Sequence, residues 1–154
     1  MTTLPSLTLP DQEGKSLHLA NLTGCWTILY FYPQDDTPGC TVEAGDFTAM
    51  IPEFETLDAR VIGISPDSCA SHRKFIDKHA LKLTLLADEN KEAINHFGVW
   101  GIKKNYGKEY EGLIRSTFLI DPNGAVVHEW RNVRAKGHAQ RVLEKLREII
   151  AAEC

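Results

Sequence analysis

Runs of apolar residues along this chain predict the strands of a buried sheet. Residues 26–32 (WTILYFY) and 60–65 (RVIGIS) are mostly apolar, which is typical of strands covered on both faces. A shorter run at 83–86 predicts a third strand. Each run is followed by polar or helix-like sequence, so we expect these strands to lie side by side with helices between them.

Two further pairs of short runs predict hairpins. Residues 4–9 and 15–19 flank a polar turn near the N-terminus. Residues 116–120 and 125–130 flank the D-P-N-G sequence, which is a strong turn signal because proline and glycine fit its backbone angles. The second pair therefore adds antiparallel strands to the sheet.

Helical spacing of apolar residues appears in four other segments: 41–58, 68–79, 91–97 and 139–151. Pro52 interrupts the apolar stripe of the first, so we expect a kink or two helical pieces there. Ser68 or Ser65 is the candidate cap of the second helix, and Asp88 is the candidate cap of the third. Residues 98–112 contain four glycines and are predicted to be a loop.

The predicted order is hairpin, β, α, β, α, β, α, hairpin, α. This order predicts a mixed central sheet with helices on both faces, and the thioredoxin-like fold has this pattern. A length of 154 residues without a linker or repeat predicts one domain, 1–154. In open α/β sheets, sites form at the carboxyl ends of strands, and the loop after Tyr32 lies at such an end.

Composition narrows the function classes. The net charge is −4, so electrostatics favour neither nucleic acid nor an anionic membrane as a partner. No apolar run approaches the length of a transmembrane helix, and the first residues lack the pattern of a secretory signal. We therefore expect a cytoplasmic protein whose cysteines are mostly reduced.

The chain has four cysteines, at positions 25, 40, 69 and 154. None forms a C-x-x-C pair, and the six histidines show no metal-ligand spacing. We therefore expect no metal site and no cofactor.

Cys40 is the candidate for chemistry. It lies in the polar, proline-rich segment FYPQDDTPGCTVE, where a strand-like run ends and a helix-like pattern begins. The unpaired amides and the positive dipole end of a helix favour the thiolate, which is the nucleophilic form. A free cysteine is often only a small buried apolar residue, but Cys40 lies outside any apolar stripe.

This segment resembles the signature of the peroxiredoxins, P-x-x-x-T-x-x-C, formed here by Pro33, Thr37 and Cys40. The form DDTPGCT-x-EA is similar to one subfamily, the bacterioferritin comigratory proteins or peroxiredoxin Q. VIGISPDS at 61–68 and the stretch 97–121 also fit it. The resemblance covers nearly the whole chain and implies a thioredoxin-like fold and thiol-dependent reduction of hydrogen peroxide and organic hydroperoxides.

The resemblance also implies roles for site residues. Cys40 would attack the peroxide, and Arg115, which matches the family's R-x-TFLID, would favour the thiolate and polarise the O–O bond. Thr37 would exchange a hydrogen bond with peroxide or thiolate, although it is also a plausible plain N-cap. Pro33 would shield the sulfur, and Gly39 would let the backbone amides approach the substrate.

Three acids, Asp35, Asp36 and Glu43, lie near the start of this helix. Their negative charges would oppose a thiolate. We therefore expect them to point away from Cys40 and to complement the helix dipole or form the turn.

The chain departs from the subfamily at its second cysteine. Many members have one five residues after the first, where this chain has Gly45, and others have one at the position of Ile76. Three routes remain for a Cys40 sulfenic acid: reduction by an external thiol, a disulfide with Cys69, or a disulfide with Cys154 or Cys25. We favour the one-cysteine route, with Cys69 as the second possibility and Cys25 as buried filler.

The sequence thus predicts a monomeric peroxidase that uses thioredoxin, glutaredoxin or a small thiol as its reductant. Two other classes stay open. A thiol–disulfide oxidoreductase on the same fold is disfavoured by the missing C-x-x-C. A redox-responsive binding protein or holdase would form the sulfenic acid without turning over.

Overall fold

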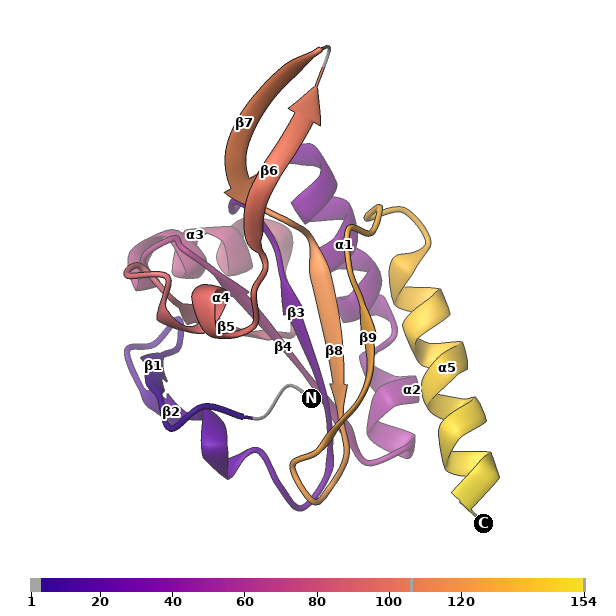
Figure 1. The fold of residues 1–154 in the computed structure, drawn as a ribbon. Coiled ribbons are helices and arrows are strands. Elements are labelled where there is room, and N and C mark those ends of the chain that lie inside the picture. Colours follow the sequence, from indigo (N-terminus) through magenta and orange to yellow (C-terminus); the bar gives the residue numbers. More distant parts are fainter. Residues whose placement is uncertain (1–3, 106, 154) are drawn as a thin grey trace.

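A five-stranded mixed sheet forms the centre of the molecule in the computed structural model, which describes residues 4–105 and 107–153 (Figure 1). The strand order is β5-β4-β3-β8-β9. β3 is parallel to β4 and β4 to β5, whereas β8 is antiparallel to both β3 and β9. The bounds are β3 (Trp26–Phe31), β4 (Ala59–Ser65), β5 (Thr84–Ala87), β8 (Ser116–Ile120) and β9 (Val126–Trp130).

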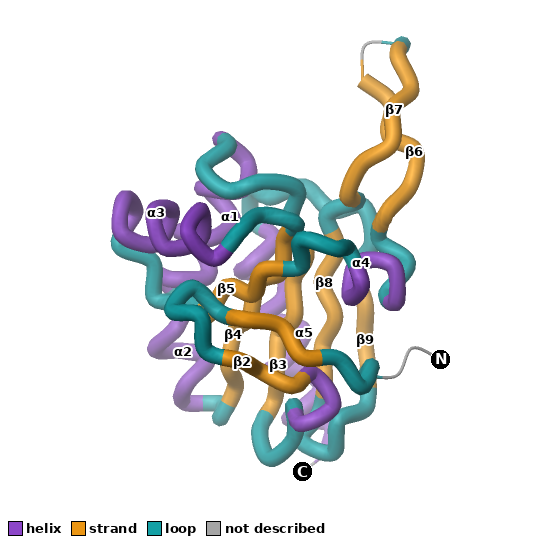
Figure 2. Tube along the Cα trace, turned by 90° about the vertical axis from the view of Figure 1, so that its left-hand side faces the viewer, coloured by secondary structure: helices purple, strands orange, loops and turns teal. Residues whose placement is uncertain are grey.

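Helices cover both faces of this sheet, as the sequence predicted (Figures 1 and 2). The fold is the thioredoxin-like fold of α/β type. The helices are α1 (Pro38–Ala49), α2 (Ile51–Thr56), α3 (Cys69–His79), α4 (Glu92–His96) and α5 (His138–Glu153), with a short 3₁₀ turn η1 (Leu19–Asn21). Among the described residues, no helix is both long enough and apolar enough to cross a membrane.

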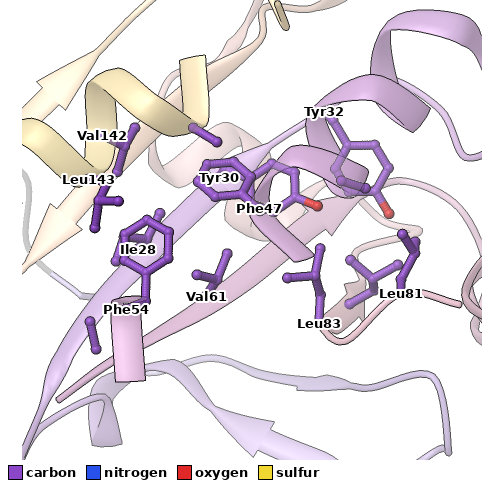
Figure 3. Close-up of a cluster of buried hydrophobic side chains, with 14 of the residues drawn as sticks. Ile28, Tyr30, Tyr32, Phe47, Phe54, Val61, Leu81, Leu83, Val142 and Leu143 are labelled. Atoms are coloured by element: carbon purple, nitrogen blue, oxygen red, sulfur yellow. The ribbon is translucent and has the colours of Figure 1, made fainter. Parts of the chain in front are cut away.

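β3 is buried along its whole length because its side chains alternate between two cores. Ile28 and Tyr30 enter the core that contains residues of α1, α2, α3 and α5, and Figure 3 shows Tyr30 beside Phe47 and Ile28 beside Phe54. The Tyr30 and Phe47 rings stack with centroids 4.8 Å apart. Leu29 enters the opposite core, beneath α4. This double burial explains why the sequence of β3 is continuously apolar.

The first predicted helix is two helices, as Pro52 indicated, with the break at Met50. Its start was wrong by three residues, because α1 begins at Pro38 and not at Thr41. Proline is favoured at the first helical position, where its missing N–H costs nothing. Cys40 therefore lies inside the first turn of α1.

The prediction of a loop at 98–112 was wrong. This segment contains β6 (Trp100–Asn105) and β7 (Lys108–Leu113), which form an antiparallel hairpin that projects away from the main sheet (Figure 1). Ile102 and Tyr110 are exposed on it, so the hairpin lacks the alternation of buried and exposed residues that marks a strand in a sequence.

The N-terminal hairpin consists of β1 (Thr8–Pro10) and β2 (Ser16–His18) and forms a separate two-stranded sheet. Ser68 caps α3 as predicted, since its Oγ accepts a hydrogen bond from the Ser71 N–H at 3.1 Å. Asp88 is not the N-cap of α4, which is Lys91. Its Oδ2 instead accepts a hydrogen bond from the Ile94 N–H inside that helix.

Candidate active site

The antiparallel pairing of β3 with β8 places Arg115 beside the start of the loop that holds Cys40. Phe31, the last residue of β3, lies opposite Ser116, the first residue of β8. Arg115 therefore lies next to Tyr32 across the sheet. The Val133 N–H donates to the Arg115 carbonyl at 3.0 Å and holds this backbone from its other side.

Cys40 and Arg115 are in direct contact. The Nη2 of Arg115 donates to the Sγ of Cys40 at 3.2 Å, and the Cys40 residue is only 1% exposed. A Cβ at Gly39 would lie 3.2 Å from the same Nη2. Gly39 therefore leaves the space in which the guanidinium approaches the first turn of α1. The sequence assigned this glycine to backbone approach, and the structure shows that it also admits Arg115.

Glu43 lies beside this pair, contrary to the prediction that it points away. Its Oε1 accepts a hydrogen bond from the Nη1 of Arg115 at 2.5 Å, and its side chain is fully buried. One guanidinium thus bridges a carboxylate and a sulfur through two different nitrogens, which is the planar fork geometry that arginine provides. The repulsion between Glu43 and a thiolate is offset by the cation between them.

Burial and charge set the protonation of this group. Burial raises the pKa of Glu43 to about 7, although the Arg115 charge and hydrogen bond oppose this rise. Burial alone would lower the pKa of Arg115, but the charges of Glu43 and Cys40 raise it overall. Arg115 therefore stays a cation, while Glu43 titrates near neutrality.

A second cation, Lys103 of β6, lies near the same group. Its Nζ donates to the Leu113 carbonyl at 2.9 Å, two residues before Arg115. Burial and the Arg115 charge lower the pKa of Lys103, whereas Cys40 raises it. The base of the projecting hairpin therefore contributes positive charge to the surroundings of Cys40.

Thr37 is the N-cap residue of α1, but its side chain makes no capping hydrogen bond. Its hydroxyl donates instead to the Gln34 carbonyl at 2.9 Å. That proton is therefore engaged, and the oxygen lone pairs are available to accept a hydrogen bond from a ligand. Pro33 is partly buried between β3 and this turn.

The first turn of α1 presents free amide groups. Thr41 is the first residue whose N–H bonds to a carbonyl of the turn, that of Thr37 at 2.8 Å. In the part of the chain that the structure describes, the N–H groups of Gly39 and Cys40 have no such partner. They are donors at the positive end of the helix.

The other described cysteines, Cys25 and Cys69, form no disulfide with Cys40. Cys69 is the first residue of α3 and is half-buried, and among the described residues Cys25, Cys40 and Cys69 are all free thiols. Cys25 is only partly buried, so the prediction that it is a buried packing residue overstated its burial. Cys154 lies outside the described residues. Gly45 is exposed in α1, and an added Cβ there would meet nothing within 4 Å.

Asp35 and Asp36 point away from Cys40, as predicted, and contact α3. Within the described ranges, no group of three histidine, cysteine or acidic side chains is placed to hold a metal ion.

Glu43 and Lys103 are the site residues that the sequence analysis missed. A signal for Glu43 was present, because it follows Cys40 by three residues and this spacing places side chains on one helix face. No such signal exists for Lys103, which reaches the site through the unpredicted β6–β7 hairpin.

Comparison with known proteins shows which family shares this arrangement. The sequence profile of the AhpC/TSA family matches residues 2–129. Peroxiredoxin Bcp of Bacillus subtilis is 46% identical over 145 residues, which are 94% of this chain and 92% of the relative. The chain belongs to this family. It is a peroxiredoxin, a peroxidase of the oxidoreductase class.

Other relatives are similar over the same extent. Peroxiredoxin Bcp of Escherichia coli is 38% identical over 144 residues, covering 94% of this chain and 92% of the relative. A cysteine-to-serine mutant of peroxiredoxin Q from Xanthomonas campestris has a TM-score of 0.89 at 40% identity, with 96% of this chain and 97% of that chain covered. A second structure, of the Xanthomonas campestris bacterioferritin comigratory protein, has the same TM-score at 39% identity, covering 96% of this chain and 97% of the other. The resemblance to the Bcp and peroxiredoxin Q subfamily is thereby confirmed.

Proposed function

We propose that this peroxiredoxin reduces hydrogen peroxide and organic hydroperoxides through a sulfenic acid at Cys40. The observation that carries the proposal is the 3.2 Å contact between the Arg115 guanidinium and the Cys40 sulfur. A fixed cation at a cysteine in the first turn of a helix favours the thiolate, which is the attacking form.

In the first step the Cys40 thiolate attacks the terminal oxygen of ROOH. The new S–O bond forms as the O–O bond breaks, so that the sulfur is oxidised to Cys–SOH and the peroxide is reduced to RO⁻. The alkoxide then takes a proton from solvent and leaves as ROH. Negative charge moves from the sulfur to the departing oxygen, so donors that contact both ends of the O–O bond stabilise the transition state.

The residues around Cys40 supply such donors. Arg115 offers its Nη2, and the first turn of α1 offers the N–H groups of Gly39 and Cys40. Thr37 accepts a hydrogen bond from the peroxide O–H, because its own proton is engaged by Gln34. Pro33 shields the sulfur from bulk water at the end of β3, which limits hydration of the thiolate.

Regeneration is proposed to follow the one-cysteine route. An external thiol R′SH attacks the sulfenic acid and releases water, giving a mixed disulfide, and a second R′SH releases Cys40 as thiol and R′SSR′ as product. In support, Gly45 and Ile76 occupy the positions at which relatives of this type have a second cysteine. The alternative is a Cys40–Cys69 disulfide, since α3 begins with Cys69.

Substrate and reductant are proposed by class. The structure of the Xanthomonas campestris relative is described in terms of alkyl peroxide reduction, which supports organic hydroperoxides as substrates of this chain. Thioredoxin, glutaredoxin and small thiols are the candidate reductants, with thioredoxin first. A monomeric state and a cytoplasmic location stay predictions from the sequence.

Mass spectrometry of the peroxide-treated protein tests the proposal. Without reductant, Cys40 should gain one or two oxygens while Cys25 and Cys69 stay thiols. Cys40→Ser should abolish peroxide consumption, whereas Cys69→Ser, the matched control, should turn over normally with an external thiol. A Cys40–Cys69 peptide would replace the one-cysteine route by the two-cysteine route, and full activity of Cys40→Ser would refute the peroxidase proposal.

A further inference from the structure

Two consecutive aspartates attach the Cys40 loop to α3. Asp35 and Asp36 follow β3 and precede Cys40 by five and four residues. Each accepts hydrogen bonds from side chains of α3. We call this set of contacts the loop–α3 clamp, formed by Asp35, Asp36, Ser71, His72, Lys78 and His79.

The inner half of the clamp is buried. The Oδ2 of Asp35 accepts from the Ser71 hydroxyl at 2.8 Å and from the Nδ1 of His72 at 2.7 Å, while its Oδ1 accepts from the Tyr32 hydroxyl at 2.6 Å. The side chain of His72 is 0% exposed and that of Asp35 is 5% exposed. The Oδ2 of Asp67, after β4, also accepts the Asp35 backbone N–H at 2.8 Å.

The hydrogen bonds of His72 join three elements. Its Nε2 lies 3.0 Å from the Leu86 carbonyl oxygen, which can only accept, so this nitrogen carries a proton. Its Nδ1 faces the carboxylate of Asp35, which also accepts from two hydroxyls. One proton is shared between Nδ1 and Oδ2, and this buried contact joins the loop, α3 and the end of β5.

The outer half of the clamp is at the surface. Asp36 has a left-handed backbone (φ 58°), and its carboxylate accepts from the Nζ of Lys78 and the Nε2 of His79, both at 2.7 Å. These hydrogen bonds lower the pKa of Asp36. Lys78 and His79 follow Ser71 and His72 by seven residues, which is about two helical turns, so one face of α3 carries both halves.

The clamp joins the loop that carries Cys40 to the helix that begins with Cys69. His72 is three residues after Cys69, and Cys40 is 1% exposed in the closed arrangement. An external thiol or Cys69 must reach the Cys40 sulfur in line with its S–O bond. The loop and the first turn of α1 therefore have to move away from α3 before the sulfenic acid can react.

We propose that Asp35 and His72, with Asp36 as an outer contact, are positioning residues that hold the Cys40 loop in its peroxide-binding arrangement and set how often it opens to thiols. This inference rests on the proposed function for its kinetic consequence, but the opening itself does not depend on it. Weakening the clamp should favour the thiol-accessible arrangement at the expense of the peroxide-binding one.

The opening can be measured by labelling reduced Cys40 with a polyethylene glycol maleimide, followed by peptide mass mapping to separate it from the other cysteines. Glutamine at position 72 can replace only one of the two hydrogen bonds that His72 makes, to Asp35 and to the Leu86 carbonyl. Loss of one hydrogen bond to a charged group should accelerate Cys40 labelling in His72→Gln about 10- to 100-fold. Asp36→Asn tolerates the left-handed backbone and should accelerate labelling only about threefold, because its ion pairs are exposed. His18→Gln, in the N-terminal hairpin, should change nothing.

A double variant tests whether the pair acts as a unit. If Asp35 and His72 form one contact, Asp35→Asn combined with His72→Gln should label Cys40 no more than about twice as fast as the faster single variant. If the acceleration of labelling in the double variant equals the product of the accelerations in the two single variants, the two residues act independently and the proposed pair is overturned.

Kinetics separate positioning from general destabilisation. His72→Gln should slow the oxidation of Cys40 by peroxide and speed the reaction of oxidised Cys40 with dithiothreitol. Slowing of both half-reactions, or unchanged labelling in both His72→Gln and Asp36→Asn, would overturn the proposal. Labelling uses no peroxide, so it tests the clamp independently of peroxidase activity. If the unmodified protein consumed no peroxide but the variants still labelled Cys40 faster as predicted, the proposed function would be refuted and the proposed clamp would stand.

Discussion

Replacing Glu43 with glutamine should make the protein more stable above neutral pH. Glu43 is fully buried, and its pKa lies at about 7, above the ordinary 4.5, because burial outweighs the attraction of Arg115. The folded protein therefore holds a proton on Glu43 that the unfolded chain releases between these values. Stability from this group is complete below pH 4.5 and is lost as the pH rises through about 7.

The loss amounts to about 3 kcal/mol, since one pKa unit corresponds to about 1.4 kcal/mol. Glutamine has the shape of the protonated acid and can still accept a hydrogen bond from the Nη1 of Arg115. At pH 4.5 the free energy of unfolding should therefore be similar for Glu43→Gln and the unmodified protein. At pH 8 the variant should be more stable by about 3 kcal/mol.

Urea unfolding between pH 4.5 and 8 measures this difference. Taking the difference between the two proteins at each pH cancels the titration of all other groups. Glu55→Gln, at an exposed position of α2, serves as the matched control and should show a difference close to zero throughout. A difference that does not change with pH, or an unmodified protein that is the more stable at pH 8, would show that the Arg115 pair outweighs the cost of burial.

Three further changes test other parts of the structure. Arg115→Lys should lower kcat/KM for peroxide about 100-fold, because one ammonium cannot bridge Glu43 and Cys40. A loss of less than threefold in steady-state assays would contradict the bridging role of Arg115. Gly45→Ala should raise the free energy of unfolding by about 1 kcal/mol in urea titrations, since the site is helical and open, and a loss of stability would mean that α1 needs glycine there. Burial lowers the pKa of His138 to about 4, so the folded protein favours its neutral form and loses about 3 kcal/mol of stability as the pH falls from 6.5 to 4. His138→Gln should remove this loss. An unchanged dependence of the free energy of unfolding on pH would contradict the prediction.

Glu43 and His138 act on stability with opposite signs. The first group loses stability as the pH rises and the second loses it as the pH falls. Between pH 4.5 and 6.5 the two effects offset each other, so the unmodified protein should show a flatter profile than either variant. The two variants together are therefore more informative than the profile of the unmodified protein.

Local sequence was sufficient for the elements whose residues follow a simple pattern. β3 is apolar throughout because both of its faces are buried, and Pro52 marks the break between α1 and α2. The β6–β7 hairpin was missed because much of its surface is exposed, so no burial pattern constrains its residues. Burial against a core makes a strand recognisable in sequence, and a projecting strand pair lacks it.

The site shows the same division. Cys40, Thr37 and Pro33 are close together in the chain, and their motif identified them. Arg115 was found only by resemblance, because the pairing of β3 with β8 that brings it to Cys40 is a tertiary fact. The contacts of Asp35 and Asp36 with α3 also depend on the packing of distant elements, so charge alone predicted only that they point away.

The register between β3 and β8 has a consequence for how this chain tolerates insertions. Cys40 and Arg115 are 75 residues apart in sequence, yet sheet hydrogen bonds near Phe31 and Ser116 fix their relative position. Residues can be inserted or deleted in the loops between Cys40 and Arg115 without altering that relative position. A single residue inserted between Leu113 and Ser116 would instead displace Arg115 relative to the ladder and separate the cation from the sulfur.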